Sequence, residues 1–241
     1  MLAGTAIRSE AMRVIESRNS VTVLSCVPAR LTFGESSKTG SLDQTMHLMG
    51  ALMPYPRNAE IFGEDEPADY IYKVISGSVR THKILGDGRR QIGAFYLPGD
   101  IFGLQFGDKH TLSAEAMTDA NVLVVKRSAI NVVAGRDATI AQELFAVTSR
   151  QLQRMQQRIL LLFKSAQERV ASFLLEMAER SPTSNTVELP MTRQDIADYL
   201  GLTIETVSRT LMCMQCAAMI DVPTSRRIVL RNRSILSQMS S

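Results

Sequence analysis

The chain has 241 residues, 45% hydrophobic and 21% charged, which is ordinary for a folded protein with one large or two smaller cores. Its net charge of +3 is unevenly divided, because residues 1–149 carry 15 Lys/Arg and 16 Asp/Glu whereas residues 150–241 carry 12 and 8. No apolar run could span a bilayer, the charged N-terminus does not fit a signal peptide, and three cysteines are too few for a disulfide framework, so we expect a cytoplasmic protein that binds no membrane.

The first half of the chain predicts an arm followed by a β-roll. Residues 1–50 show no clear apolar period, and we expect a partly ordered arm with one short helix near Glu10–Arg18. From about Ala59–Lys126 the pattern changes to that of strands. Asp87-Gly88 marks a hairpin turn, because Gly accepts the positive φ that the turn demands. Short strands with Gly turns predict a small β-barrel or roll over residues 51–135.

A long helix is predicted next, over residues 136–163. Its positions at alternating spacings of four and three are almost all apolar: Ala141, Phe145, Thr148, Leu152, Met155, Ile159 and Leu162. Such a heptad seam packs along a partner surface. Two interpretations are open: the seam packs on the roll of its own chain, or it pairs with the same helix of a second copy in a homodimer. In either case we expect the flanking Arg150, Arg154 and Arg158 to be solvated.

Residues 164–241 predict a winged helix-turn-helix domain. We expect a helix over Lys164–Arg180 and a strand over Val187–Leu189. Two helices around a turn at Gly201 follow within Thr192–Met214. Two strands, Met219–Val222 and Arg227–Leu230, then lie on either side of Pro223–Ser225. Thr192 fits an N-cap, and Asp195 three residues later comes close to a capping box. With the roll and the long helix, the predicted fold class is α+β.

The second helix of this motif carries a candidate DNA-reading face. Glu205, Ser208 and Arg209 stand at i, i+3 and i+4 and therefore share one side of the helix. A carboxylate can accept from cytosine N4, and Arg can donate to guanine O6 and N7. The alternative is a simple surface pair of Glu205 with Arg209. The Gly turn, the flanking helix and the wing favour sequence-specific binding to double-stranded DNA.

Residues around this face are candidates for phosphate contacts, which position a protein without reading sequence. The candidates are Thr192, Arg193, Thr203, Thr206 and, in the wing, Arg226 with Arg227. The wing arginines have a second interpretation, since charged side chains also keep a sheet edge soluble.

Two long segments resemble the CRP/FNR family of bacterial transcription regulators, and most of all its FixK branch. They are DGRRQIGAFYLPGDIFG at Asp87–Gly103 and MTRQDIADYLGLTIETVSRTL at Met191–Leu211, and the resemblance covers about Ala51–Met239. It implies that Glu205, Ser208 and Arg209 form the family's E-x-x-S-R reader of a TTGA half-site in an inverted repeat. It also implies a homodimer that activates genes for micro-oxic respiration and nitrogen fixation by contact with RNA polymerase.

The same resemblance argues against a cofactor. The cyclic-AMP branch binds its nucleotide through a Gly-Glu and an Arg-Ser pair, and the matching positions here are Gly103-Leu104 and Leu112-Ser113. The ribose carboxylate and the phosphate-binding guanidinium are thus missing. The oxygen-sensing FNR branch holds an iron–sulfur cluster, which needs four thiolates, but only Cys26 precedes the DNA-binding domain. We therefore expect neither group, as in the FixK branch.

Two features of the second helix are left open by the sequence. Cys213 and Cys216 form an isolated C-x-x-C, which is either a pair of small residues at a helix end or a redox-sensitive pair of thiols. Ala218 stands where the family commonly has Gly, so a left-handed turn there would cost about 1 kcal/mol.

No metal site or enzyme activity is expected. His47, His82 and His110 are scattered, and no nucleophile is paired with a base. The alternative function is a regulator of the same family that a small molecule or a redox change controls, with a different set of target genes.

Overall fold

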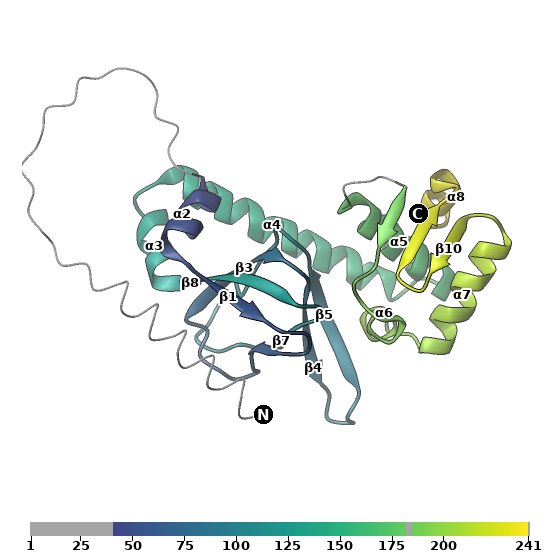
Figure 1. Ribbon diagram of the computed structural model, residues 1–241, viewed down its shortest axis with the longest axis horizontal. Helices are drawn as coiled ribbons and strands as arrows, with labels where there is room; N and C mark the ends of the chain where they lie inside the picture. The colour runs from purple at the N-terminus through teal and green to yellow at the C-terminus, as the bar shows by residue number, and fades with distance from the viewer. Residues whose placement is uncertain (1–40, 182–184, 241) are drawn as a thin grey trace, which may run out of the picture.

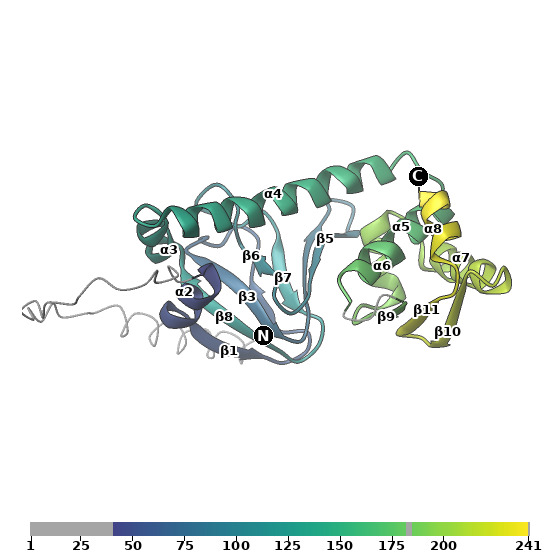
Figure 2. The same cartoon turned by 90° about the horizontal axis from the view of Figure 1, so that it is seen from above.

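Two lobes joined by one long helix make up the protein (Figure 1). The computed structural model describes residues 41–181 and 185–240, so the predicted helix near Glu10–Arg18 and Cys26 lie outside the described residues. One lobe is an antiparallel β-roll, and the other is a winged helix-turn-helix. The long helix, α4 (Ala138–Leu161), runs along the roll and ends at the second lobe (Figure 2). The predicted α+β class is confirmed.

The roll consists of two four-stranded antiparallel sheets, in the orders β1-β8-β3-β6 and β2-β7-β4-β5. The strands are β1 (Ala51–Tyr55), β2 (Glu60–Phe62), β3 (Tyr70–Ser76), β4 (Val79–Ile84), β5 (Arg90–Tyr96), β6 (Ile101–Phe102), β7 (Ser113–Ala116) and β8 (Ala120–Lys126). Side chains from both sheets meet in one core, in which the rings of Phe62, Tyr72 and Phe102 contact one another. Gly88, in the turn between β4 and β5, has a φ of 82°, as the hairpin prediction required.

The roll begins earlier in the chain than its period-two pattern indicated. Pro54 lies within β1, which is tolerated because β1 is an edge strand. Ahead of it, α2 (Leu42–Met49) buries Leu42 and Met46 against the roll. The Leu42 amide donates to the carboxylate of Glu143 in α4 at 2.7 Å. The described end of the predicted arm is therefore ordered and packs on the roll.

Two further short helices have no counterpart among the predicted elements. They are α3 (Arg127–Ala134), which buries Ile130, and α8 (Arg233–Ser240), which buries Leu236. Each has eight residues, about two turns, which gives too few repeats for the 3.6-residue period to stand out in the sequence.

The apolar seam of α4 is largely exposed, although Met155, Ile159 and Leu162 also line a cavity that α4 shares with the roll. The helix packs on its own roll through another face, with Ile140 buried and Leu144 and Val147 partly buried. The seam side chains are 56% to 75% exposed: Phe145, Leu152, Met155, Ile159 and Leu162. The interpretation in which this seam packs on the roll of its own chain is therefore wrong.

The second lobe contains three helices, a three-stranded sheet and the closing helix α8. Its elements are α5 (Ala166–Glu179), β9 (Thr186–Glu188), α6 (Arg193–Leu200), α7 (Ile204–Cys216), β10 (Ile220–Thr224) and β11 (Arg227–Leu230), with the sheet order β10-β11-β9. The wing turn is at residues 225–226, because β10 continues through Pro223 to Thr224, later than predicted.

The two lobes share a packed contact. Phe95 of β5 contacts the rings of Phe173 and Tyr199, with centroids 6.2 and 5.0 Å apart, and belongs to the same apolar core as the helix-turn-helix. In consequence α6 lies beside β5 (Figure 2). Within residues 41–181 and 185–240, no helix has the length and apolar character needed to cross a membrane.

Ala218 does adopt the strained conformation that the sequence suggested. Its φ is 53°, its amide donates to the carbonyl of Gln215, and the Met219 amide donates to that of Met214. This is the Schellman ending, which favours Gly.

We expect Ala218→Gly to raise the free energy of unfolding by about 1 kcal/mol in denaturant titrations. As a control, Ala217→Gly, where φ is −79°, should lower it by about 0.5–1 kcal/mol. If both substitutions changed the free energy of unfolding by the same amount and in the same direction, the inferred backbone strain at Ala218 would be contradicted.

Candidate nucleic-acid interface

The first helix of the motif, α6, is fixed at both ends by local bonds. At its start the Thr192 hydroxyl accepts from the Asp195 amide at 3.1 Å, and Asp195 accepts from the Thr192 amide at 2.9 Å. This reciprocal capping box satisfies donors that the helix leaves unpaired. At its end Gly201 has φ 65° and ψ 41°, the left-handed turn that the sequence predicted. The chain then enters α7 in a defined direction.

The second helix, α7, presents the predicted reading face to solvent. Its inner side buries Val207, Leu211 and Met214 in the domain core. On the other side Glu205 and Arg209 are exposed and Ser208 is half-buried. Bonds from its own backbone N–H and from the Thr203 side chain lower the pKa of Glu205, so its carboxylate is a charged acceptor at neutral pH. The face therefore offers an anion, a hydroxyl and a guanidinium side by side.

The predicted phosphate-contacting residues lie at the starts of α6 and α7 and in the wing. Thr192 and Thr203 are the exposed N-caps of α6 and α7, so they stand where helix amides favour an anion. The Thr203 hydroxyl is also 3.0 Å from that of Thr206, and Arg193 is half-buried at the first position of α6.

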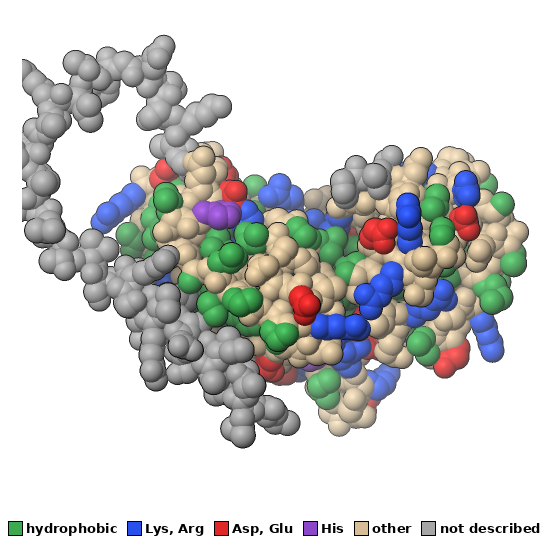
Figure 3. Space-filling model, viewed as in Figure 1, with side chains coloured by type: hydrophobic (Ala, Val, Ile, Leu, Met, Phe, Trp, Pro, Cys, Tyr) green, Lys and Arg blue, Asp and Glu red, His purple; other side chains and the backbone are tan. Residues whose placement is uncertain are grey.

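The two wing arginines have different surroundings. Arg226 is exposed in the wing turn. Arg227 is in β11, the central strand of its sheet, and its Nε is 3.6 Å from a carboxylate oxygen of Glu188. The suggested role of protecting a sheet edge therefore does not apply to Arg227. Figure 3 shows Lys and Arg side chains on this lobe and along the junction with the roll.

The cysteines and histidines do not gather into a site. Cys213 and Cys216 are free and exposed on α7. His110 is buried in the roll and stacks on Phe62 at 3.6 Å between centroids, while His47 is at the surface. Among the residues that the structure describes, no group of three or more His, Cys, Asp or Glu could hold a metal ion.

Charged groups that the sequence did not bring together meet at the junction of the lobes. Asp195, 2% exposed, is paired with Arg80 of β4 at 2.8 Å and with Arg90 of β5 at 2.6 Å. Arg90 also donates to Asp198 at 2.9 Å, one turn further along α6. Arg90, Asp195 and Asp198 lie in the two sequence segments that carry the family resemblance, whereas Arg80 lies outside both, and nothing in the spacing of these residues indicated that the segments touch.

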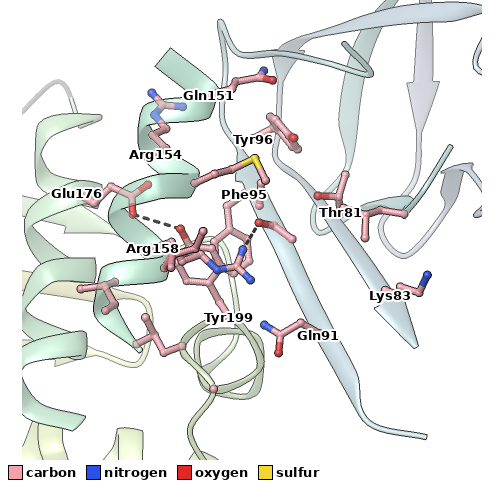
Figure 4. A pocket seen from close by; sticks show the side chains of 18 of the residues that line it. Thr81, Lys83, Gln91, Phe95, Tyr96, Gln151, Arg154, Arg158, Glu176 and Tyr199 are labelled. Carbon is pink, nitrogen blue, oxygen red and sulfur yellow. Dashed lines mark hydrogen bonds between the residues drawn. The ribbon is translucent and has the colours of Figure 1, made fainter. Parts of the chain in front are cut away.

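A cavity of about 490 Å³ opens beside this junction, between β4, β5, α4 and the helix-turn-helix (Figure 4). Burial raises the pKa of Glu176 in its wall, against the opposing effect of Arg180 and Arg154, and Glu176 accepts from the Tyr199 hydroxyl at 3.4 Å. The Arg158 guanidinium lies 4.7 Å from the centre of the Tyr199 ring and donates to the Gly93 carbonyl.

The flanking arginines of α4 are therefore not all solvated. Arg150 is exposed as expected, but Arg154 and Arg158 are half-buried in the cavity wall. The expectation fails for these two because the second lobe folds back onto α4 and the roll and covers that flank.

Comparison with known proteins gives the family. Two family models match, a Crp-like helix-turn-helix domain over residues 168–239 and a cyclic nucleotide-binding domain over residues 52–137. The nitrogen fixation regulation protein FixK of Azorhizobium caulinodans is 50% identical over 204 residues, 82% of each chain. That of Rhizobium meliloti is 38% identical over 175 residues, 72% of this chain and 80% of the other. The solved structure of FixK2 from Bradyrhizobium japonicum superposes with a TM-score of 0.76 at 49% identity, over 80% of this chain and 98% of that one.

A β-roll joined through a long helix to a winged helix-turn-helix with an exposed reading face defines a DNA-binding transcription regulator rather than an enzyme. The chain belongs to the CRP/FNR family of these regulators, and the predicted similarity to its FixK branch is confirmed.

The roll does not fit the nucleotide that its domain type implies. Leu112 lines the cavity beside Gly93, and its Cδ1 would be 2.6 Å from a Cβ added at that glycine. The family resemblance implies that this is the position of the phosphate-binding guanidinium of the cyclic-AMP branch, and the side chain here is aliphatic. Leu104 likewise supplies no carboxylate. A buried phosphate would lack its counter-charge there.

Proposed function

We propose that the protein acts in the cytoplasm as a homodimer that binds an inverted repeat of TTGA-type half-sites. There it activates genes for micro-oxic respiration and nitrogen fixation through contact with RNA polymerase. The observation that carries the proposal is the exposed face of Glu205, Ser208 and Arg209 on α7. The capped helix α6 and the turn at Gly201 hold α7 in place. The relatives named as nitrogen fixation regulators support the choice of target genes.

Reading by this face follows from its chemistry. Arg209 is exposed and has a planar fork that can donate two bonds to guanine O6 and N7, and Glu205 can accept from cytosine N4. Thr192, Arg193, Thr203, Thr206 and Arg226 surround the face and supply bonds to phosphates, which set the register on the duplex. Sequence preference then depends on the three central side chains alone.

Dimerisation is supported by the uncovered seam of α4. Five large apolar side chains on one helix face are an interaction surface rather than a solvated one. Burying one leucine-sized side chain contributes about 1.5–3 kcal/mol, so mutual burial of two such seams gives a stable pair. A two-fold dimer sets its two recognition helices roughly 34 Å apart, one turn of DNA, and so requires a palindromic site.

The cavity favours a second candidate function, in which a small molecule controls DNA binding. Its lining includes both roll residues and the helix-turn-helix residues Tyr199, Leu200 and Gly201, so an occupant would touch both lobes. A further form of control is oxidation of Cys213 and Cys216, whose thiols are exposed beside the reading face. Strong operator binding by purified protein without additives, unchanged by reductant, would exclude both forms.

Replacing Arg209 with Ala tests the reading face. We expect a loss of about 1–3 kcal/mol in binding to the selected site, with relaxed preference at one base pair of each half-site. Arg226→Ala is the matched control, because a phosphate contact contributes to all sequences alike. Quantitative binding to the selected site and to its single-base variants measures both. Equal weakening by Arg209→Ala on every sequence would show that Arg209 contacts phosphate instead.

Replacing Leu152 with Glu tests the seam. In the proposed dimer each copy buries this leucine, so two charges would enter the interface and we expect a shift from dimer to monomer in sedimentation measurements. Gln153→Glu adds the same charge one residue away at another exposed position of α4 and should leave the dimer intact. A monomeric wild type, or a Leu152→Glu variant that still sediments as a dimer, would contradict the proposed interface.

A further inference from the structure

Asp195 is bonded to both lobes at once. Its Oδ2 accepts from the Thr192 amide at 2.9 Å and from the Thr192 hydroxyl at 2.8 Å, which closes the first turn of α6. Its Oδ1 accepts from Arg80 at 2.8 Å and from Arg90 at 2.6 Å, both on strands of the roll. The start of the helix-turn-helix is thereby held directly on the β4–β5 hairpin.

The charges in this junction balance only when the lobes are docked. Arg80 is 9% exposed and also pairs with Glu115 of β7 at 3.0 Å. Arg90 reaches Asp198 as well as Asp195, and the Gln91 side chain donates to the Asp198 backbone carbonyl at 2.7 Å. Separating the lobes would leave the Arg80 guanidinium without one of its two carboxylate partners. It would also break the pairs of Arg90 with Asp195 and Asp198. Removing one partner of a buried ion pair is strongly destabilising, because it leaves an uncompensated charge.

One other directional contact joins the lobes, since Arg180 at the end of α5 pairs with Asp100 of the roll and donates to the Phe95 carbonyl. The covalent link between α4 and α5 is the short non-helical segment Leu162–Ser165, in which the carbonyls of Leu162 and Lys164 accept from Arg169. The remaining contact is apolar: the lobe packs on Ile92, Phe95 and Met117 of the roll and on α4 at the cavity wall. Apolar contacts are non-directional, whereas the hydrogen bonds of a planar guanidinium to two separate carboxylates define an orientation, and Arg80 and Arg90 each bridge two carboxylates in this way.

We propose that Arg80 and Arg90 are positioning residues for DNA binding, which clamp α6 to the roll through Asp195 and Asp198. Because α6 and α7 share one core and a rigid turn, the clamp sets the angle of α7 relative to the roll and to α4. In the dimer it therefore sets the separation of the two reading faces, and with it the spacer that the protein accepts between half-sites. The inference rests on the proposed binding to an inverted repeat.

The chain supplies a matched control for this role. Arg89 is adjacent to Arg90, but its side chain is 78% exposed and its ion pair, with Asp87 at 2.7 Å, stays within the hairpin turn. Arg90 is 25% exposed and reaches across to the other lobe. Arg89→Ala and Arg90→Ala each remove one positive charge from the same end of the hairpin. A difference in DNA binding between these two variants therefore reflects the clamp and not the net charge.

The test measures binding of full-length proteins to palindromes whose spacer is varied one base pair at a time around the selected length. We expect Arg90→Ala to lose roughly 5- to 150-fold affinity at the best spacer, the usual range for coupled equilibria, and to discriminate less between spacers. The affinity and spacer preference of Arg90→Lys should lie between those of wild type and Arg90→Ala, because an ammonium keeps the charge but not the planar guanidinium geometry. Arg89→Ala should match wild type. Asp198→Asn, which weakens the clamp from α6, should loosen the spacer preference as Arg90→Ala does.

Three results would overturn the clamp. The first is an Arg90→Ala protein with the wild-type affinity and spacer preference. The second is a loss of affinity with an unchanged spacer preference, which a smaller folded fraction alone would produce. The third is an equal loss on non-palindromic DNA, which would make Arg90 a phosphate contact. A wild-type protein that prefers no palindrome would instead refute the proposed function, before any variant is compared.

Discussion

The buried carboxylate of Asp195 connects the local structure of the DNA-binding motif with the arrangement of the whole molecule. One of its oxygens closes the capping box of α6, and the other accepts from two arginines of the roll. A helix terminus that leaves amides unpaired needs such a cap, and a buried anion needs cationic partners. Both requirements are met by one side chain, whose buried charge is balanced by the arginines only when the motif is docked on the roll.

This docking links parts of the chain that have separate roles. The roll carries the arginines, α4 carries the uncovered apolar seam, and α7 carries the reading face. With the seam of α4 paired across a two-fold axis, the position of α7 depends on how the second lobe sits on the roll. The cavity beside the junction, with Arg158 stacked on Tyr199, belongs to the same contact. Leu112, which the family resemblance matches to the phosphate-binding position of the cyclic-AMP branch, is aliphatic, and in our account protein side chains hold the lobes together.

The sequence alone was sufficient to predict those structural features that depend on a local pattern of residues. The Gly201 turn and the hairpin at Gly88 follow from the backbone freedom of glycine, and the reading face follows from helical spacing, whereas the strain at Ala218 was suggested by the family resemblance. It was insufficient where the outcome depends on contacts between distant segments. The burial of Arg154 and Arg158, and the pairing of Arg80 and Arg90 with α6, join residues more than 40 positions apart, and no period or spacing encodes such contacts. Likewise the strand β1 lies ahead of the period-two pattern that the sequence shows, and its Pro54 is tolerated because the strand lies at a sheet edge.

The most direct test of this account is a crystal structure of the full-length protein on a selected palindromic duplex. The account predicts two copies paired along α4, with Glu205 and Arg209 of each copy against base edges in the major groove. It also predicts that Asp195 stays within ion-pair distance of both Arg80 and Arg90 in that complex. A complex in which α7 reads the groove while the lobes have separated and these pairs are broken would contradict the central claim that the docked arrangement is the DNA-reading one.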